Sequence, residues 1–223
     1  PTNNFCTMNP LSPCTNYSLS EGNLKYTQTG ALSKAFATLP FPSSGKWYVE
    51  IDVLKSSSAI HGPFFGIMNH FIQSAGHGDG LCRESGMYGI IDDDSTYAGA
   101  TLMAPAGNVS TFGPAILDGN ILQIAWDADN RKLYLGKDDT YYAYDKGTDG
   151  NPTSGTNETL SITDSYQYSF CVGQISSDNG AALMTINCGQ DSSFAGDKTA
   201  QGNSDSNGIG DFYYTPPTDF LAL

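Results

Sequence analysis

The sequence predicts an all-β protein, built as a two-sheet antiparallel β-sandwich with long decorated loops. Short runs rich in Val, Ile, Tyr, Phe and Trp alternate with clusters of Gly, Asn, Asp and Ser, and no long window repeats its apolar residues at helical spacing. The chain of 223 residues contains 25 Gly and 11 Pro, which is typical of a loop-rich globular protein. Several apolar runs have no polar side, as expected of strands that are buried on both faces.

Eight segments are predicted as strands on these grounds. In the clearest of them, alternation places Trp47, Val49 and Ile51 on one dry face of a strand and leaves the other face to solvent. A tight hairpin turn is predicted at Asp127–Asn130, because short acceptor side chains suit such turns. The predicted strands are Asn23–Gln28, Lys46–Leu54, Pro63–Met68, Met87–Ile91, Ile121–Trp126, Lys132–Gly136, Tyr166–Gly173 and Ala182–Asn187.

The whole chain, residues 1–223, is predicted to form a single domain. No linker, repeat or low-complexity block divides it, and a polar, Gly-rich insertion is expected at about 196–211. The first residues lack the basic and apolar regions of a secretory leader. Pro1 is what remains when an initiator Met is removed before a small residue, which favours an intact cytosolic translation product.

The net charge of −13 narrows the classes of partner. It comes from 10 basic and 23 acidic residues. Because a negative protein repels the phosphate backbone and the sequence has no cluster of Lys or Arg, nucleic acid is not an expected partner. The apolar runs are too short for a membrane helix. Neutral sugars, cations and neutral or basic protein surfaces remain as possible ligands.

Five cysteines occur without a C-x-x-C pair, so the usual thiolate zinc site is not expected. Cys171 and Cys188 lie in apolar runs, where we expect them to act as small buried hydrophobic residues. A disulfide between these two, or between Cys6 and Cys14, is the alternative.

Seven motifs occur in one order over nearly the whole chain: Gly45–Ile51, Tyr88–Ile90, Asp118–Asp127, Arg131–Leu135, Asn151–Thr156, Ile186–Gln190 and Tyr213–Phe220. Together they resemble the SPRY domain. Two departures stand out: Cys188 occupies a position that is usually aromatic in the family, and Lys137–Thr140 replaces a common Asn-Gly turn. The opening Asn3–Leu11 and the close Phe220–Leu223 resemble the SPRY domains of tailed-phage and environmental viral structural proteins.

The resemblance implies a concanavalin-like β-sandwich of the jelly-roll type that binds ligands through loops at one edge, without catalytic machinery or a required metal. The viral branch implies a bacteriophage virion surface or tail protein, a fibre or decoration protein, assembled in the host cytoplasm as a homo-oligomer. Its expected partners are other virion proteins and a host cell-surface protein or glycan. An extracellular protein is the alternative location.

Two other functions are weighed against this one. A carbohydrate-binding module on the same scaffold, assisted by calcium, is the first; exposed aromatic residues would support it. A glycosidase of the laminarinase type is the second, suggested by Glu50 and Asp52. Retaining and inverting glycosidases need two suitably spaced carboxyl groups, and the next acid of that motif is missing, so we expect a solvated strand face instead.

Candidate ligand-binding residues gather in two segments. Residues 59–80 interleave His with Gly and aromatic residues, and loops of this kind on a rigid sandwich commonly carry recognition. The second segment is a dense Tyr run, part of which we expect in the core. Calcium is considered at Asp92, Asp93 and Asp94, because three adjacent carboxylates repel one another without a cation or solvent. The ligand-binding candidates are His61, Phe64, His70, Phe71, His77, Asp79, Tyr141, Tyr142 and Tyr144.

Overall fold

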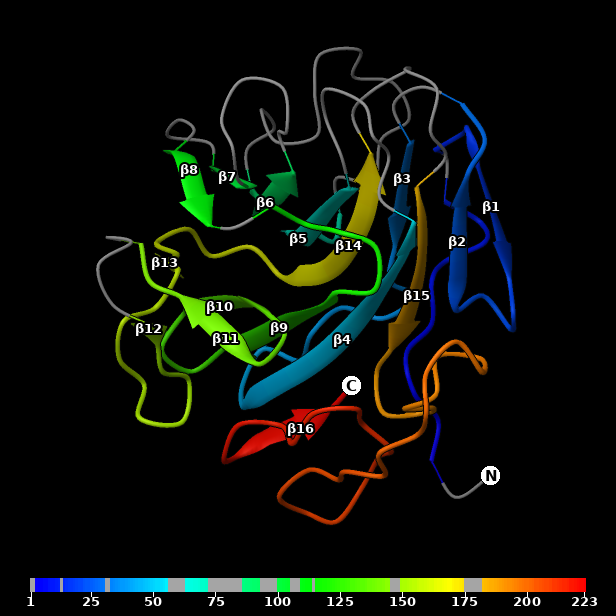
Figure 1. Ribbon diagram of the computed structural model, residues 1–223. Helices are drawn as coiled ribbons and strands as arrows, with labels where there is room; N and C mark the ends of the chain where they lie inside the picture. Colours follow the sequence, from blue (N-terminus) through cyan, green and yellow to red (C-terminus); the bar gives the residue numbers. More distant parts are fainter. Residues whose placement is uncertain are drawn as a thin grey trace.

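The structure is a computed structural model of the chain, and its elements confirm the all-β prediction. It describes residues 3–12, 14–30, 33–55, 63–71, 86–92, 100–104, 109–113, 115–144, 149–174 and 182–223. These residues form sixteen strands in two antiparallel sheets, with one parallel pairing at the C-terminus (Figure 1). No helix in this part of the chain is long and apolar enough to cross a membrane.

The larger sheet has ten strands in the described residues. Its order is β1-β2-β15-β4-β9-β10-β11-β12, with β13 paired to β10 and β16 paired in parallel to β4. The strands are β1 (Tyr17–Ser20), β2 (Lys25–Gln28), β4 (Lys46–Lys55), β9 (Ile121–Asp127), β10 (Lys132–Lys137), β11 (Thr140–Tyr142), β12 (Asp149–Gly150), β13 (Leu160–Ser161), β15 (Leu183–Asn187) and β16 (Phe220–Ala222).

The smaller sheet has six strands among the described residues, in the order β3-β14-β5-β6-β7-β8. They are β3 (Ser33–Phe36), β5 (Pro63–Asn69), β6 (Met87–Asp92), β7 (Ala100–Met103), β8 (Val109–Gly113) and β14 (Tyr168–Gln174). All eight strands predicted from the sequence are present, with ends displaced by one or two residues.

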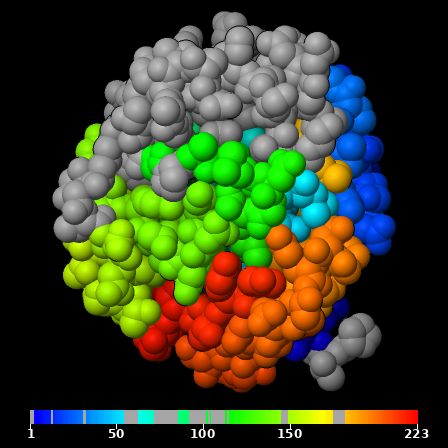
Figure 2. Space-filling view, in the orientation of Figure 1, coloured from blue at the N-terminus to red at the C-terminus, as the bar shows by residue number. Residues whose placement is uncertain are grey.

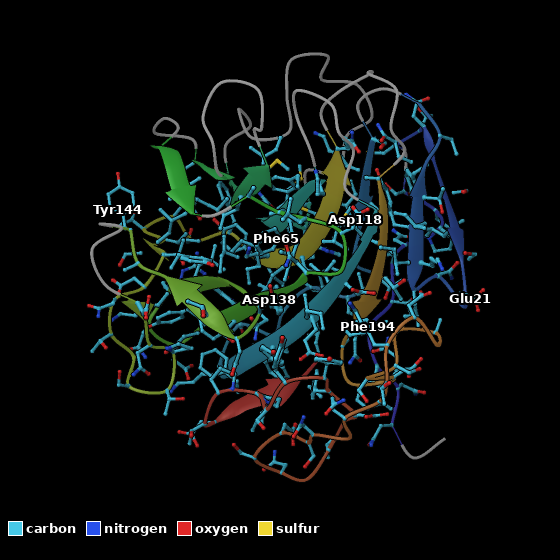
Figure 3. The ribbon with its side chains drawn as sticks, in the orientation of Figure 1. Glu21, Phe65, Asp118, Asp138, Tyr144 and Phe194 are labelled. Atoms are coloured by element: carbon cyan, nitrogen blue, oxygen red, sulfur yellow. The ribbon has the colours of Figure 1, made fainter. Side chains whose placement is uncertain are left out.

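The main core lies between the two sheets, where side chains of alternating positions meet. Val49 and Ile51 of β4 face Phe65 of β5 and Val172 of β14, and Phe65 is seen inside the body in Figure 3. Trp47 is on this face as predicted, but it is only half-buried, whereas Trp126 is fully enclosed. Burying each large apolar side chain contributes roughly 1.5–3 kcal/mol, so this layer fixes the register of the strands.

The opposite face of β4 is also covered, which corrects the prediction of a solvated face. The C-terminal segment, residues 189–223, runs across the larger sheet in Figure 1 and forms a continuous surface in Figure 2. Phe212 and Phe220 of this segment pack with Tyr48, Tyr134 and Tyr141 from the sheet. The expected insertion at 196–211 is therefore part of a covering layer.

The four cysteines among the described residues are free thiols. Cys171 and Cys188 are both buried, as predicted, but they lie in different apolar clusters. Cys171 lies with Phe36 and Phe64 in a cluster separate from the main core, whereas Cys188 belongs to the main core. The two alternatives considered for a disulfide, Cys171 with Cys188 and Cys6 with Cys14, do not form here.

Candidate functional site

The described part of the first predicted binding segment ends at an exposed aromatic residue. Phe71 follows β5 and is 77% exposed, with its ring edge-on to that of His70 at a centroid distance of 5.6 Å. The His70 backbone N–H donates to the Gln167 carbonyl at 2.8 Å, which fixes this corner beside the chain entering β14. The other predicted residues of this loop, His61, His77 and Asp79, lie outside the described residues.

Phe64 and the Tyr residues do not form one surface in this structure. Phe64 is fully buried in the cluster around Phe36. Tyr141 and Tyr142 point to opposite faces of the sheet, because they are neighbours on β11: Tyr141 is buried beneath the C-terminal segment, and Tyr142 packs against the main core. Tyr144 is 55% exposed and projects outward at the left of Figure 3.

A hollow of about 690 Å³ lies next to the chain at His70, which is hydrogen-bonded to Gln167. Three segments enclose it: the chain before β4, the β9–β10 turn, and the chain leading into β14. Gln167, which accepts the His70 bond, is one of its lining residues. The lining consists of Phe41, Pro42, Ser43, Trp126, Ala128, Arg131, Thr163, Asp164, Ser165, Tyr166, Gln167 and Tyr168.

The predicted hairpin turn positions Arg131 in this hollow. Asp127 accepts from the Asn130 backbone N–H and side-chain amide, both at 2.9 Å, and Asp129 accepts from the Gly45 N–H at 3.0 Å. Arg131 then adopts a left-handed backbone conformation, with φ of 57°. The acceptor side chains predicted to make a turn thus also tie it to the segment before β4.

The Arg131 guanidinium lies over two aromatic rings. Its central carbon is 5.2 Å from the Trp126 ring centroid and 5.4 Å from that of Tyr168. The two rings meet edge-on at 5.6 Å. Cation–π attraction of about 0.5–2 kcal/mol per pair holds the guanidinium against these two rings.

Asp164 is the acceptor that orders the site. Its carboxylate accepts from the Tyr88 hydroxyl at 2.7 Å, from the Tyr168 hydroxyl, and from Arg131 Nη2 at 3.4 Å. Burial, together with the hydrogen bond to Asp164, raises the pKa of Tyr88 to about 12. Burial likewise raises the pKa of Tyr168, again with Asp164 adding to the effect. Both tyrosines therefore remain donors at neutral pH.

The charges of Arg131 and Asp164 compensate each other within the hollow. Arg131 Nη1 donates to the Tyr166 carbonyl at 3.2 Å, and Nη2 donates to the Asp164 carbonyl. Tyr166 is 37% exposed, so an aromatic ring remains at the rim beside hydroxyl and amide side chains. This composition suits a ligand of mixed polarity without a large net charge.

Sequence reasoning did not identify Arg131 and Asp164 as site residues. They are 33 positions apart and no motif connects them, so only the folding of the β9–β10 turn against the chain before β14 brings them together. One signal was available: an Arg directly after a predicted turn, with several Tyr residues near a predicted strand, is a combination that can form a cation–π site.

The two carboxylates that were weighed for a glycosidase lie elsewhere and are enclosed. Glu50 and Asp52 are fully buried under the C-terminal segment, and Lys198 of that segment lies 3.2 Å from Asp52. Asp52 pairs with this lysine, and the four donors around Glu50 occupy its two oxygens. A sugar has no access to carboxylates held in this way, so the pair has a structural role.

No metal site is formed by the described residues, in which no group of three or more His, Cys, Asp or Glu side chains is placed to hold an ion. Of the residues considered for calcium, Asp92 ends β6, and Asp93 and Asp94 lie outside the described residues. Calcium binding at these three residues stays a prediction.

Comparison with known proteins supports the fold. No protein-family model and no curated protein matches the chain. Among solved structures, the SPRY domain of human HERC1 superposes with a TM-score of 0.58 at 15% identity, covering 80% of this chain and 96% of that one. The PSpry domain of TRIM65 gives 0.57 at 11% identity, covering 82% and 92%. The chain thus has a SPRY-like β-sandwich fold.

Proposed function

We propose that the chain is a non-enzymatic binding module that recognises a segment of another protein at the hollow around Arg131. The observation that carries the proposal is a site already formed by a fixed turn, an aromatic base and a compensated ion pair. Its volume of about 690 Å³ falls within the range of sites that take a small ligand or a short chain segment. Preorganisation of this kind reduces the entropic cost of binding.

The chemistry of the lining favours a peptide of mixed polarity. Tyr166 offers ring surface at the rim, and Ser43, Thr163 and Gln167 offer groups that match backbone N–H and C=O groups. The exposed Phe71 adds an apolar surface at the neighbouring corner. Tyr residues supply contact area at low entropic cost, which is why they recur in binding surfaces.

A peptide-display selection tests this proposal with a matched pair of variants. Peptides selected on the wild-type protein should lose at least about tenfold in affinity for Tyr166→Ala, since loss of the aromatic ring that contacts the peptide at the rim should cost at least about 1.4 kcal/mol. Tyr144→Ala removes the same side chain from an exposed position outside the hollow and should leave affinity unchanged. Both variants should melt within a few degrees of the wild type.

Equal affinity of the selected peptides for Tyr166→Ala and the wild type would contradict the proposed site. A glycan is the competing ligand, because aromatic rims with hydroxyl and amide groups also bind sugars. Binding on a glycan array together with failure of the peptide selection would replace the peptide proposal by the carbohydrate-binding alternative.

We further propose that the module acts in a bacteriophage virion, as a surface or tail component assembled as a homo-oligomer. The support is the resemblance of Asn3–Leu11 and Phe220–Leu223 to viral structural proteins. Mass spectrometry of purified particles should detect the chain at a stoichiometric level, and native mass spectrometry should give a multiple of the 23.7 kDa subunit. Absence of the chain from the purified particles would overturn the virion assignment, and a monomer in native mass spectrometry would overturn the homo-oligomer.

A further inference from the structure

The N-terminal segment and the end of β15 meet at the last residue of the chain. The Cys6 N–H donates to the Leu223 carbonyl at 2.8 Å, and the Leu223 N–H donates to the Cys188 carbonyl at 3.3 Å. A single residue therefore holds the backbones of Cys6 and Cys188 next to each other, although 182 positions separate them in the sequence.

Gln190 makes a second bridge between the same two residues. Its side-chain nitrogen donates to the Cys6 carbonyl at 3.0 Å, and its side-chain oxygen accepts from the Cys188 N–H. Both bonds come from one carboxamide group, whose oxygen and nitrogen are bonded to the same carbon. The two backbones are thus held together by one side chain as well as by Leu223.

The two side chains lie in the same part of the molecule, and both are fully buried in the main core. The Thr38 hydroxyl lies 3.5 Å from the Cys6 sulfur. The Cys188 side chain, which has the largest effect, and Thr38 lower the pKa of Cys6 to about 7, whereas burial raises the pKa of Cys188. The pair therefore contains one thiol suited to attack and one that stays protonated until it reacts.

We propose that Cys6 and Cys188 are a redox modification site, which forms a reversible disulfide by exchange with a low-molecular-weight disulfide. The Cys6 thiolate attacks the reagent disulfide and forms a mixed disulfide, releasing one reagent thiol. Cys188 then loses its proton and attacks the Cys6 sulfur, which releases the second reagent thiol. In balance, two protein thiols are oxidised to one disulfide and one reagent disulfide is reduced to two thiols.

The N-terminal segment gives the reagent a route to the buried pair. Asn3 and Asn4 are exposed and Phe5 is half-buried, so the residues just before Cys6 bury little surface. Segments with few buried side chains open locally at a lower free energy than the core. The disulfide then closes a loop that contains most of the chain and fastens its N-terminal segment to the end of the larger sheet.

The test uses the wild-type chain, reduced and then incubated with oxidised glutathione at about pH 7.5. Peptide mapping by mass spectrometry without reduction should identify one linked pair, Cys6 with Cys188. The melting temperature should rise by about 5–15 °C, and dithiothreitol should reverse the change. Cys14→Ser serves as the matched control, because it removes a described cysteine that packs against another cluster and should leave both the link and the shift unchanged.

Two variants separate the disulfide from an effect of substitution on folding. Cys6→Ser and Cys188→Ser should each abolish the glutathione-dependent shift, measured against the melting temperature of the same variant under reduction. A link of Cys6 to a different cysteine would overturn the proposal. Only glutathionylated protein without a Cys6–Cys188 link, or no rise in melting temperature when that link forms, would also overturn it.

Discussion

Lowering the pH from about 7 to about 5 should stabilise the protein through Glu50. This carboxyl group is fully buried, and burial raises its pKa from 4.5 to about 7. It accepts from the N–H groups of Tyr213 and Tyr214 at 2.8 and 2.7 Å, from the Tyr48 hydroxyl at 3.0 Å and from Asn187 at 3.2 Å. These four bonds favour the ionised form, but the loss of hydration is the larger effect.

The sign of the effect follows from the raised pKa. Between the unfolded value of 4.5 and the folded value of about 7, the folded state binds a proton that the unfolded chain has released. The stabilisation is therefore complete at pH values below the pKa of Glu50 in the unfolded chain, and it is lost as the pH rises through the pKa of Glu50 in the folded state. The difference of pKa values corresponds to about 3 kcal/mol, of which about 2 kcal/mol falls between pH values of about 5 and 7.

Urea unfolding followed by Trp fluorescence at these pH values gives the measurement. Glu50→Gln is neutral at both pH values but sets an amide NH₂ against N–H donors, so it should be less stable than the wild type at about pH 5. It should lack the loss of about 2 kcal/mol that the wild type shows between about pH 5 and about pH 7. Glu21→Gln changes an exposed acid at the tip of the β1–β2 hairpin and should follow the wild type (Figure 3). A wild type that gains stability relative to Glu50→Gln as the pH rises would refute the reasoning and show that the four hydrogen bonds dominate.

Two further predictions concern packing. Trp126→Ala should destabilise the fold by about 3–5 kcal/mol and Trp47→Ala by less, because Trp126 is fully enclosed and Trp47 is half-buried; equal losses in urea unfolding would contradict this order. Gly66→Ala should yield little folded protein, since a Cβ atom there would lie 2.1 Å from the Tyr88 carbonyl oxygen; a normal circular dichroism spectrum and melting curve would show that the strands can separate enough to admit it.

The sequence predicted the strands best where packing is decided locally. Lys46–Leu54 and Ile121–Trp126 carry their apolar pattern within a few residues, and both were found with nearly the predicted ends. Strands β12 and β13 are two residues each and depend on their partners, so no local pattern marks them.

The candidate site was less predictable, because its parts meet only in the folded chain. Phe71 and Tyr144, two of the predicted ligand-binding candidates, are exposed. Burial of Glu50 was not expected, because the segment that covers it is rich in Gly and resembles a loop in the sequence. In the structure this segment packs against the larger sheet through the residues around Phe212. In the sequence, Arg131 belongs to a motif that predicts a strand. In the structure it has a left-handed backbone conformation and lines the hollow.

The most direct test of the proposed binding site is a map of amide chemical-shift changes on titrating the ¹⁵N-labelled protein with a selected peptide. We expect the largest changes in the three segments that enclose the hollow, 41–45, 126–131 and 163–168, and at the neighbouring Phe71. Changes concentrated in the C-terminal segment instead, with residues 126–131 and 163–168 unaffected, would contradict binding at the hollow.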